Sequence, residues 1–151
     1  MIRRSLQREA RRRLLSEVLK RLRARRGLRS HEVAARMGLE HRSYERFEAG
    51  EVRLDLERLF LFAEATDSDP LAIVCAIHLQ RSELALLCAD NKLMLIEALA
   101  LERFTKRLGE DVRKLEASTL IDAFEGTFDR LADEFEAREQ RARTWLRDPQ
   151  D

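Results

Sequence analysis

Apolar residues recur every three or four positions over most of the chain, which is the spacing of one face of a helix. Near the N-terminus, Leu15, Leu19 and Leu22 carry this pattern. Gly27 follows and can take the left-handed conformation that ends a helix. We therefore predict a first helix over residues 5–26.

Two short helices are predicted next, with a glycine between them. Ser30 is the expected N-cap of the second helix, and Gly38 stops that helix. A third helix runs over about residues 40–49 and ends at Gly50. Short helix, glycine turn and short helix together make the helix-turn-helix arrangement.

The helical spacing continues through the second half of the chain. Asp69 is expected to cap the fifth helix, with Pro70 at its first position. The pattern changes after about residue 80, where longer apolar segments begin. The further predicted segments are Leu56–Ala63, Ser82–Ala89, Leu93–Leu108 and, after a capping box at Thr119–Asp122, a last helix reaching Trp145, with residues 110–117 unassigned.

Composition narrows the fold class. The 151 residues include only 5 glycines and 2 prolines, too few for a sandwich or barrel with frequent turns. The longest uncharged run is the 11 residues of Pro70–Gln80, against the ~20 that a membrane-spanning helix needs. We expect an all-α protein without a membrane partner.

The near-zero net charge of +1 conceals an uneven distribution. Residues 1–50 carry 15 basic and 6 acidic side chains, whereas residues 110–151 carry 7 and 12. A basic end suggests contact with a polyanion, although a solvated helix face is the simpler alternative. Arginines near the N-terminus are expected either to contact DNA or to extend a solvated helix: Arg3, Arg4, Arg8, Arg11, Arg12 and Arg13.

No arrangement of residues supports catalysis or cofactor binding. The sequence has no nucleophile with a matching base and no glycine-rich phosphate loop. Cys75 and Cys88 lack metal-ligand spacing and are expected to be buried thiols in a reducing compartment. We expect no enzyme activity, no metal and no cofactor.

The predicted helix-turn-helix has an inward and an outward face. Met37, Leu39, Tyr44 and Phe47 are expected to point inward and fix the angle between the two helices. The outward face of the third helix carries four polar residues: His41, Arg42, Glu45 and Arg46.

Residues 15–74 resemble the phage-repressor and Cro-like helix-turn-helix family, also called the xenobiotic-response-element family. Departures include Arg29, where a Thr or Ser is usual, and the polar residues Thr66 and Ser68. The matching positions are Leu22-Arg23, Gly27-Leu28, Glu32-Val33-Ala34, Met37-Gly38, Phe47-Glu48-Ala49-Gly50, Leu56, Leu59 and Ala63.

The resemblance implies a five-helix, lambda-repressor-like domain whose third helix enters the DNA major groove. Arginine suits guanine, because its fork matches O6 and N7 together. The resemblance also implies a partly buried ion pair between Arg23 and Glu48, since a carboxylate among apolar side chains is costly unless paired. The expected DNA contacts are Arg29, Ser30, His31, His41, Arg42, Ser43, Glu45, Arg46 and Arg53.

The C-terminal half is expected to hold two copies together, because two-fold dimers read paired half-sites. The alternatives are packing within one chain, or binding of a different protein, as in an antitoxin. We expect a DNA-binding domain over residues 1–80 and a dimerisation or partner-binding region over 81–151. The expected interface residues are Leu93, Ile96, Leu99, Phe124, Phe128, Leu131 and Phe135.

These observations predict a homodimeric regulator of transcription, of the repressor type, that binds specific double-stranded DNA. It is expected in the cytoplasm, associated with a bacterial nucleoid or with phage DNA. The alternative is an antitoxin-like protein-interaction module whose C-terminal helices bind a different protein.

Overall fold

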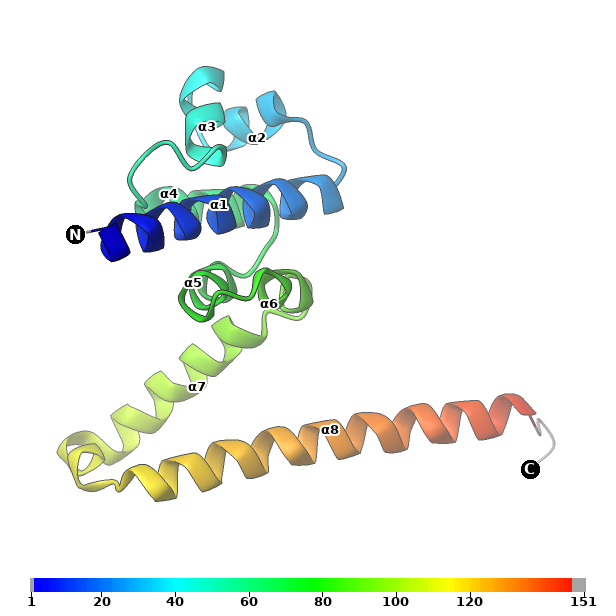
Figure 1. Cartoon of the computed structure of the whole chain (residues 1–151). Coiled ribbons are helices and arrows are strands. Elements are labelled where there is room, and N and C mark those ends of the chain that lie inside the picture. The colour runs from blue at the N-terminus through cyan, green and yellow to red at the C-terminus, as the bar shows by residue number, and fades with distance from the viewer. Residues whose placement is uncertain (1, 148–151) are drawn as a thin grey trace. The chain divides into compact units, whose positions relative to one another are not determined.

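The computed structural model describes residues 2–147, with the side chains of residues 7–147. Within this range the chain forms eight α-helices and one 3₁₀ helix and contains no strand, which confirms the all-α class (Figure 1). The elements are α1 (Ile2–Arg25), α2 (Ser30–Arg36), α3 (His41–Glu48), α4 (Leu56–Ala65), α5 (Pro70–Leu79), α6 (Ser82–Leu87), α7 (Leu93–Leu108), η1 (Gly109–Lys114) and α8 (Ala117–Arg147).

The chain divides into two compact units, Met1–Arg103 and Phe104–Asp151. The first unit extends past the domain boundary expected at residue 80. The reason is that α6 packs against α1 and α5, with Ala85 fully buried. Local periodicity shows where α6 lies along the chain but does not show which helices it contacts.

Helix α1 is the centre of the first unit. It packs against α3 on one side and against α5 and α6 on the other (Figure 1). Each of these helices contributes apolar side chains to one continuous core. The largest fully buried side chains in this core are Val18, Leu19, Leu22, Val33, Tyr44, Phe47, Leu59, Phe62 and Ile73.

Two glycines allow the close packing of the helix-turn-helix. Gly38 has φ +67° in the turn between α2 and α3, a left-handed conformation that glycine adopts without strain. Gly50 has φ +71° after α3, and a Cβ there would lie 2.6 Å from the carbonyl oxygen of Arg12 on α1. The end of α3 therefore approaches the backbone of α1 as closely as a residue without a side chain permits.

Two predicted N-caps are wrong, and α1 begins at Ile2 instead of residue 5. Arg29, not Ser30, is the N-cap of α2, because the side chain of Glu32 accepts a hydrogen bond from the Arg29 N–H at 2.6 Å. Helix α8 begins at Ala117, so Thr119 lies inside the helix instead of capping it. The unassigned segment before α8 continues from α7 as η1, with Gly109 at φ +57°.

Asp69 caps α5, as predicted, and also the start of α7. Its Oδ1 accepts hydrogen bonds from the N–H groups of Leu71 and Ala72 at 3.1 and 3.2 Å. Its Oδ2 accepts from Met94 and Leu95 at 2.9 and 3.2 Å. The side chain is fully buried, so one carboxylate joins the N-termini of two helices.

A cluster of surface ion pairs joins the same region to the end of α1. Arg25 and Arg26 contact Asp90 at 2.5 and 2.8 Å, and Lys92 contacts Asp67 at 3.0 Å. Arg25 is the last residue of α1 and Arg26 follows it, whereas the other residues lie before α5 and α7. This arrangement holds the start of α7 on the first unit.

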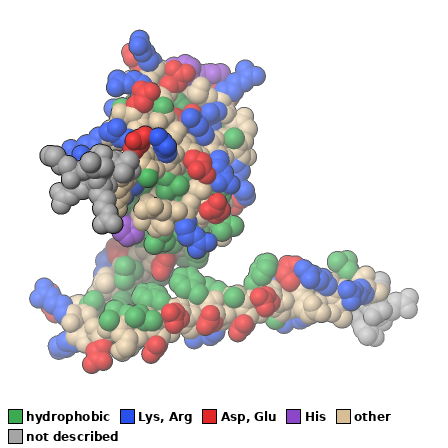
Figure 2. All heavy atoms as spheres, viewed as in Figure 1, with side chains coloured by type: hydrophobic (Ala, Val, Ile, Leu, Met, Phe, Trp, Pro, Cys, Tyr) green, Lys and Arg blue, Asp and Glu red, His purple; other side chains and the backbone are tan. Residues whose placement is uncertain are grey.

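The second unit contains the end of α7, η1 and α8. Within α8, which lies wholly in the described range, no residue is buried. Figure 2 shows hydrophobic side chains gathered along this helix beside acidic ones.

Of the two thiols, Cys88 is buried as expected, but Cys75 is only half-buried. No helix in the described residues combines the length and the apolar character needed to cross a membrane.

Candidate nucleic-acid interface

Helix α3 has one buried face and one exposed face. Tyr44 and Phe47 are fully buried, and their spacing of three residues places them on the same side of the helix. Their rings lie 6.4 Å apart, and Phe47 also lies 6.2 Å from Phe62 of α4. Aromatic packing on this side leaves the opposite side of α3 to solvent.

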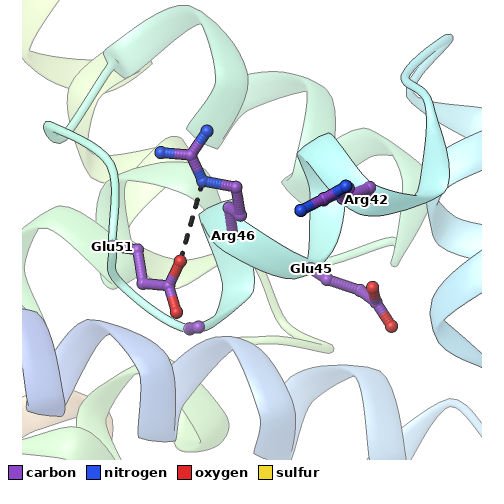
Figure 3. A pocket seen from close by; sticks show the side chains of 5 residues that line it. Arg42, Glu45, Arg46 and Glu51 are labelled. Atoms are coloured by element: carbon purple, nitrogen blue, oxygen red, sulfur yellow. Dashed lines mark ion pairs between the residues drawn. The ribbon is translucent and has the colours of Figure 1, made fainter.

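The exposed face carries the four residues expected there: His41, Arg42, Glu45 and Arg46. The last three line a shallow, open depression together with Ala49 and Glu51 (Figure 3). Arg46 Nε lies 3.6 Å from Glu51 Oε2, whereas Glu45 points away from Arg46 (Figure 3). Both partners of the Arg46 ion pair are 60% exposed, so this pair can open at little cost.

The start of α2 lies beside the start of α3. Ser30 Oγ is within hydrogen-bonding distance of His41 Nε2, at 2.8 Å, and the rings of His31 and His41 meet edge to face at 6.3 Å. His41 Nε2 also lies 3.5 Å from Glu45 Oε1. The structure thus brings four of the predicted site residues into one polar group at the junction of the two helices.

The remaining predicted contacts lie outside this group. Arg29 and Arg53 are exposed, in the segments before α2 and after α3, and Ser43 is half-buried on α3. Of the arginines near the N-terminus, Arg3 and Arg4 have side chains outside the described residues. The other four are exposed on α1, and the last of them is paired with Glu9: Arg8, Arg11, Arg12 and Arg13.

An ion pair holds α3 against α1. Arg23 donates from Nε to Glu48 Oε1 at 2.5 Å and from Nη2 to Glu48 Oε2 at 3.1 Å. Arg23 Nη1 also donates to the carbonyl of Leu28 at 3.0 Å, and the Tyr44 hydroxyl donates to Glu48 Oε1 at 2.7 Å. Hydrogen bonding to Glu48 raises the pKa of Arg23, and burial raises the pKa of Tyr44 far above its ordinary value.

Two arginines of the basic N-terminal region form hydrogen bonds with backbone carbonyls of the same chain. Arg36 donates to the carbonyl of Ala65 at 2.9 Å, and Arg26 donates to the carbonyls of Thr66 and Asp67 at 2.8 and 2.6 Å. They satisfy the end of α4, whose last carbonyls lack partners in the helix. The sequence analysis counted these arginines only as positive charges. Their hydrogen bonds to backbone carbonyls could not be predicted, because every residue has a backbone carbonyl and the sequence does not show which one is the acceptor.

The polar residues Thr66 and Ser68, which depart from the Cro-like pattern, are buried and bonded to each other. Their hydroxyl oxygens lie 2.9 Å apart, and Thr66 Oγ1 donates to the carbonyl of Phe62 at 2.8 Å. Because each hydroxyl has a hydrogen-bond partner, the segment keeps a compact turn into α5.

Among the described residues, no group of three His, Cys, Asp or Glu side chains could hold a metal ion.

The comparison with protein families agrees with this geometry. Residues 14–71, which contain α2, α3 and α4, match the family model described as a helix-turn-helix domain. Comparisons with curated proteins and with solved structures gave no significant match. The chain therefore carries an N-terminal helix-turn-helix domain, which indicates a DNA-binding regulator.

Proposed function

We propose that the protein is a sequence-specific regulator of transcription that binds double-stranded DNA as a homodimer, with α3 in the major groove. The observation that carries this proposal is the exposed face of α3. This face presents Arg42, Glu45 and Arg46 side by side, on a helix whose other face is fixed by buried aromatic rings. We also propose that the protein belongs to the phage-repressor and Cro-like family and acts in the cytoplasm.

The residues of this face have different expected roles. Arg42 is the leading candidate for base contact, since a guanidinium can bind guanine O6 and N7 together. Arg46 can do the same after release from Glu51, and Glu45 can accept a hydrogen bond from cytosine N4. The proposed contacts to phosphates and the groove edge are Arg29, Ser30, His31, His41, Ser43 and Arg53.

The proposed dimer uses apolar residues of α7 and α8. Exposed hydrophobic side chains in a row mark an interaction surface on a soluble protein. Ile96 and Phe135, for instance, are 58% and 63% exposed. The proposed interface residues are Leu93, Ile96, Leu99, Phe124, Phe128, Leu131 and Phe135.

The same apolar side chains would also suit a second candidate function, in which the C-terminal helices bind a different protein and the helix-turn-helix plays a lesser part. DNA binding separates the two. The full chain is used to select bound duplexes from a random pool, followed by footprinting of the selected site. The proposed function predicts two protected half-sites about one helical turn, ~34 Å, apart. Failure to enrich any sequence would favour the protein-interaction module instead.

A further inference from the structure

Helix α8 carries a row of apolar residues in which steps of three and four alternate. This α8 stripe consists of Ile121, Phe124, Phe128, Leu131, Phe135, Ala142 and Trp145, with Arg138 in the place between Phe135 and Ala142. Alternating steps of three and four are the pattern of a two-helix coiled-coil seam.

The stripe lacks a partner in the described part of one chain. Phe128 and Phe135 are 43% and 63% exposed, and no residue of this 31-residue helix is buried. Most helical stability in proteins comes from packing of an apolar face. A helix of this length with six large apolar residues exposed in one row is therefore expected to pack on another surface.

Charge is distributed unevenly along α8. Residues 117–136 carry six acidic side chains and one basic one, whereas residues 137–147 carry four basic side chains and one acidic one. The helix dipole favours this order of charges, but its effect fades within the first and last turns. It does not account for an acidic segment that runs over most of the helix.

We propose that α8 pairs with α8 of a second copy in antiparallel orientation, so that the acidic segment of each lies along the basic segment of the other. A parallel pair would align acidic segments with each other and bring the two Arg138 side chains together in the seam. An antiparallel pair instead places each Arg138 near carboxylates of the second copy. The inference deepens the homodimer within the proposed function and does not depend on DNA binding.

Distances between spin labels test the orientation directly. Single cysteines are placed at Ser118, near the start of α8, or at Ala132, near its middle, in a full-length Cys75→Ser, Cys88→Ala background. At 1.5 Å per residue, antiparallel pairing predicts more than about 30 Å between two labels at position 118 and less than about 20 Å at position 132. Circular dichroism and light scattering of each labelled protein check that the fold and the dimer are kept.

Charge reversal provides a second test in the full chain. Glu125→Lys with Glu134→Lys, or Arg138→Glu with Arg141→Glu, should each raise the dimer dissociation constant by about tenfold or more. All four changes in one chain should restore it to within about threefold of wild type, because the two positions made basic then lie along the two positions made acidic in the second copy.

Three results would overturn the inference. A short distance at position 118 in a dimeric protein means parallel pairing and leaves the homodimer itself standing. If the fourfold variant does not dimerise as wild type does, the acidic and basic segments do not pair between the two copies. A full-length protein that is monomeric at micromolar concentration removes both the pairing and the homodimer. None of these readouts involves DNA, so a failure here is distinct from a failure of DNA binding.

Discussion

The Arg23 guanidinium binds the Glu48 carboxylate through two parallel hydrogen bonds, and the Glu48 side chain is only 8% exposed. The pair joins the last turn of α1 to the last turn of α3. Tyr44, one turn earlier on α3, adds a hydrogen bond to the same carboxylate. The orientation of the proposed recognition helix thus depends on a charge pair inside the protein, on the side away from Arg42.

Removing either partner should strongly destabilise the fold. Arg23→Ala leaves a carboxylate buried without its counter-charge, and we expect a loss of about 3 kcal/mol in the free energy of unfolding, measured with urea. Glu48→Ala should cost a similar amount. The double variant should lose less than the sum, with a coupling of about 1–3 kcal/mol.

A matched control exists on the surface of α1. Arg13→Ala removes the partner of Glu9 in an exposed pair and should cost less than about 0.5 kcal/mol. If the losses at Arg23 and Glu48 are equally small and additive, the pair does not fix α3.

Gly50→Ala should destabilise the protein more than Gly38→Ala. Both glycines have positive φ, which costs an alanine about 1–2 kcal/mol. Only at Gly50 would the added Cβ also meet the backbone of Arg12. Gly126 lies within α8, and a Cβ added there would meet no other atom within 4 Å. Gly126→Ala should therefore be neutral or stabilising by up to about 1 kcal/mol. Thermal unfolding ranks the three variants, and equal effects at Gly38 and Gly50 would contradict the close approach.

Asp69→Ala should release α7 as well as α5. Four backbone N–H groups lose their acceptor in a buried place, so we expect a loss of about 3 kcal/mol. Asp55→Ala removes the cap of α4 alone, at the surface, and should cost about 1 kcal/mol. Hydrogen exchange should show faster exchange at Met94 and Leu95 only in the Asp69 variant. Unchanged protection there would mean that α7 does not depend on this carboxylate.

Acid should weaken the ion-pair cluster around α7. Lys92 lowers the pKa of Asp67, and hydrogen bonds from Arg25 and Arg26 lower the pKa of Asp90. Groups with depressed pKa in the folded state stabilise it above their unfolded pKa of about 4 and lose that contribution as pH falls further. Asp67→Asn with Asp90→Asn should therefore flatten the fall in stability between neutral pH and about pH 3. Glu64→Gln, at an exposed position on α4, serves as the control, and parallel curves for all three proteins would contradict this assignment.

The helices could be predicted from the sequence because their signals are local. Apolar spacing, Gly27, Gly38 and the Asp69-Pro70 pair marked elements that the structure contains. The start of α8 was predicted wrongly, because a short capping pattern also occurs within a helix.

The unpredicted features depend on contacts between distant parts of the chain. The second oxygen of Asp69 binds α7 about 25 residues away, and Arg26 and Arg36 bind backbone carbonyls near the end of α4. The residues around each side chain in the sequence do not show which distant groups it binds. The exposed face of α3 was predictable because it follows from helical spacing alone, whereas the link from Ser30 to His41 required the angle between two helices.

We expect the exposed face of α3 to recognise the DNA sequence. The most direct measurement compares Arg42→Ala with Arg113→Ala, an exposed arginine on η1, by fluorescence anisotropy on the selected duplex and on a scrambled duplex at matched salt. We predict that Arg42→Ala weakens binding to the selected duplex by ~1–3 kcal/mol and relaxes preference at one base position, with a smaller loss on the scrambled duplex. Arg113→Ala should bind the selected duplex as wild type does. Equal affinity of the Arg42→Ala and wild-type proteins for the selected duplex would contradict the placement of α3 in the major groove.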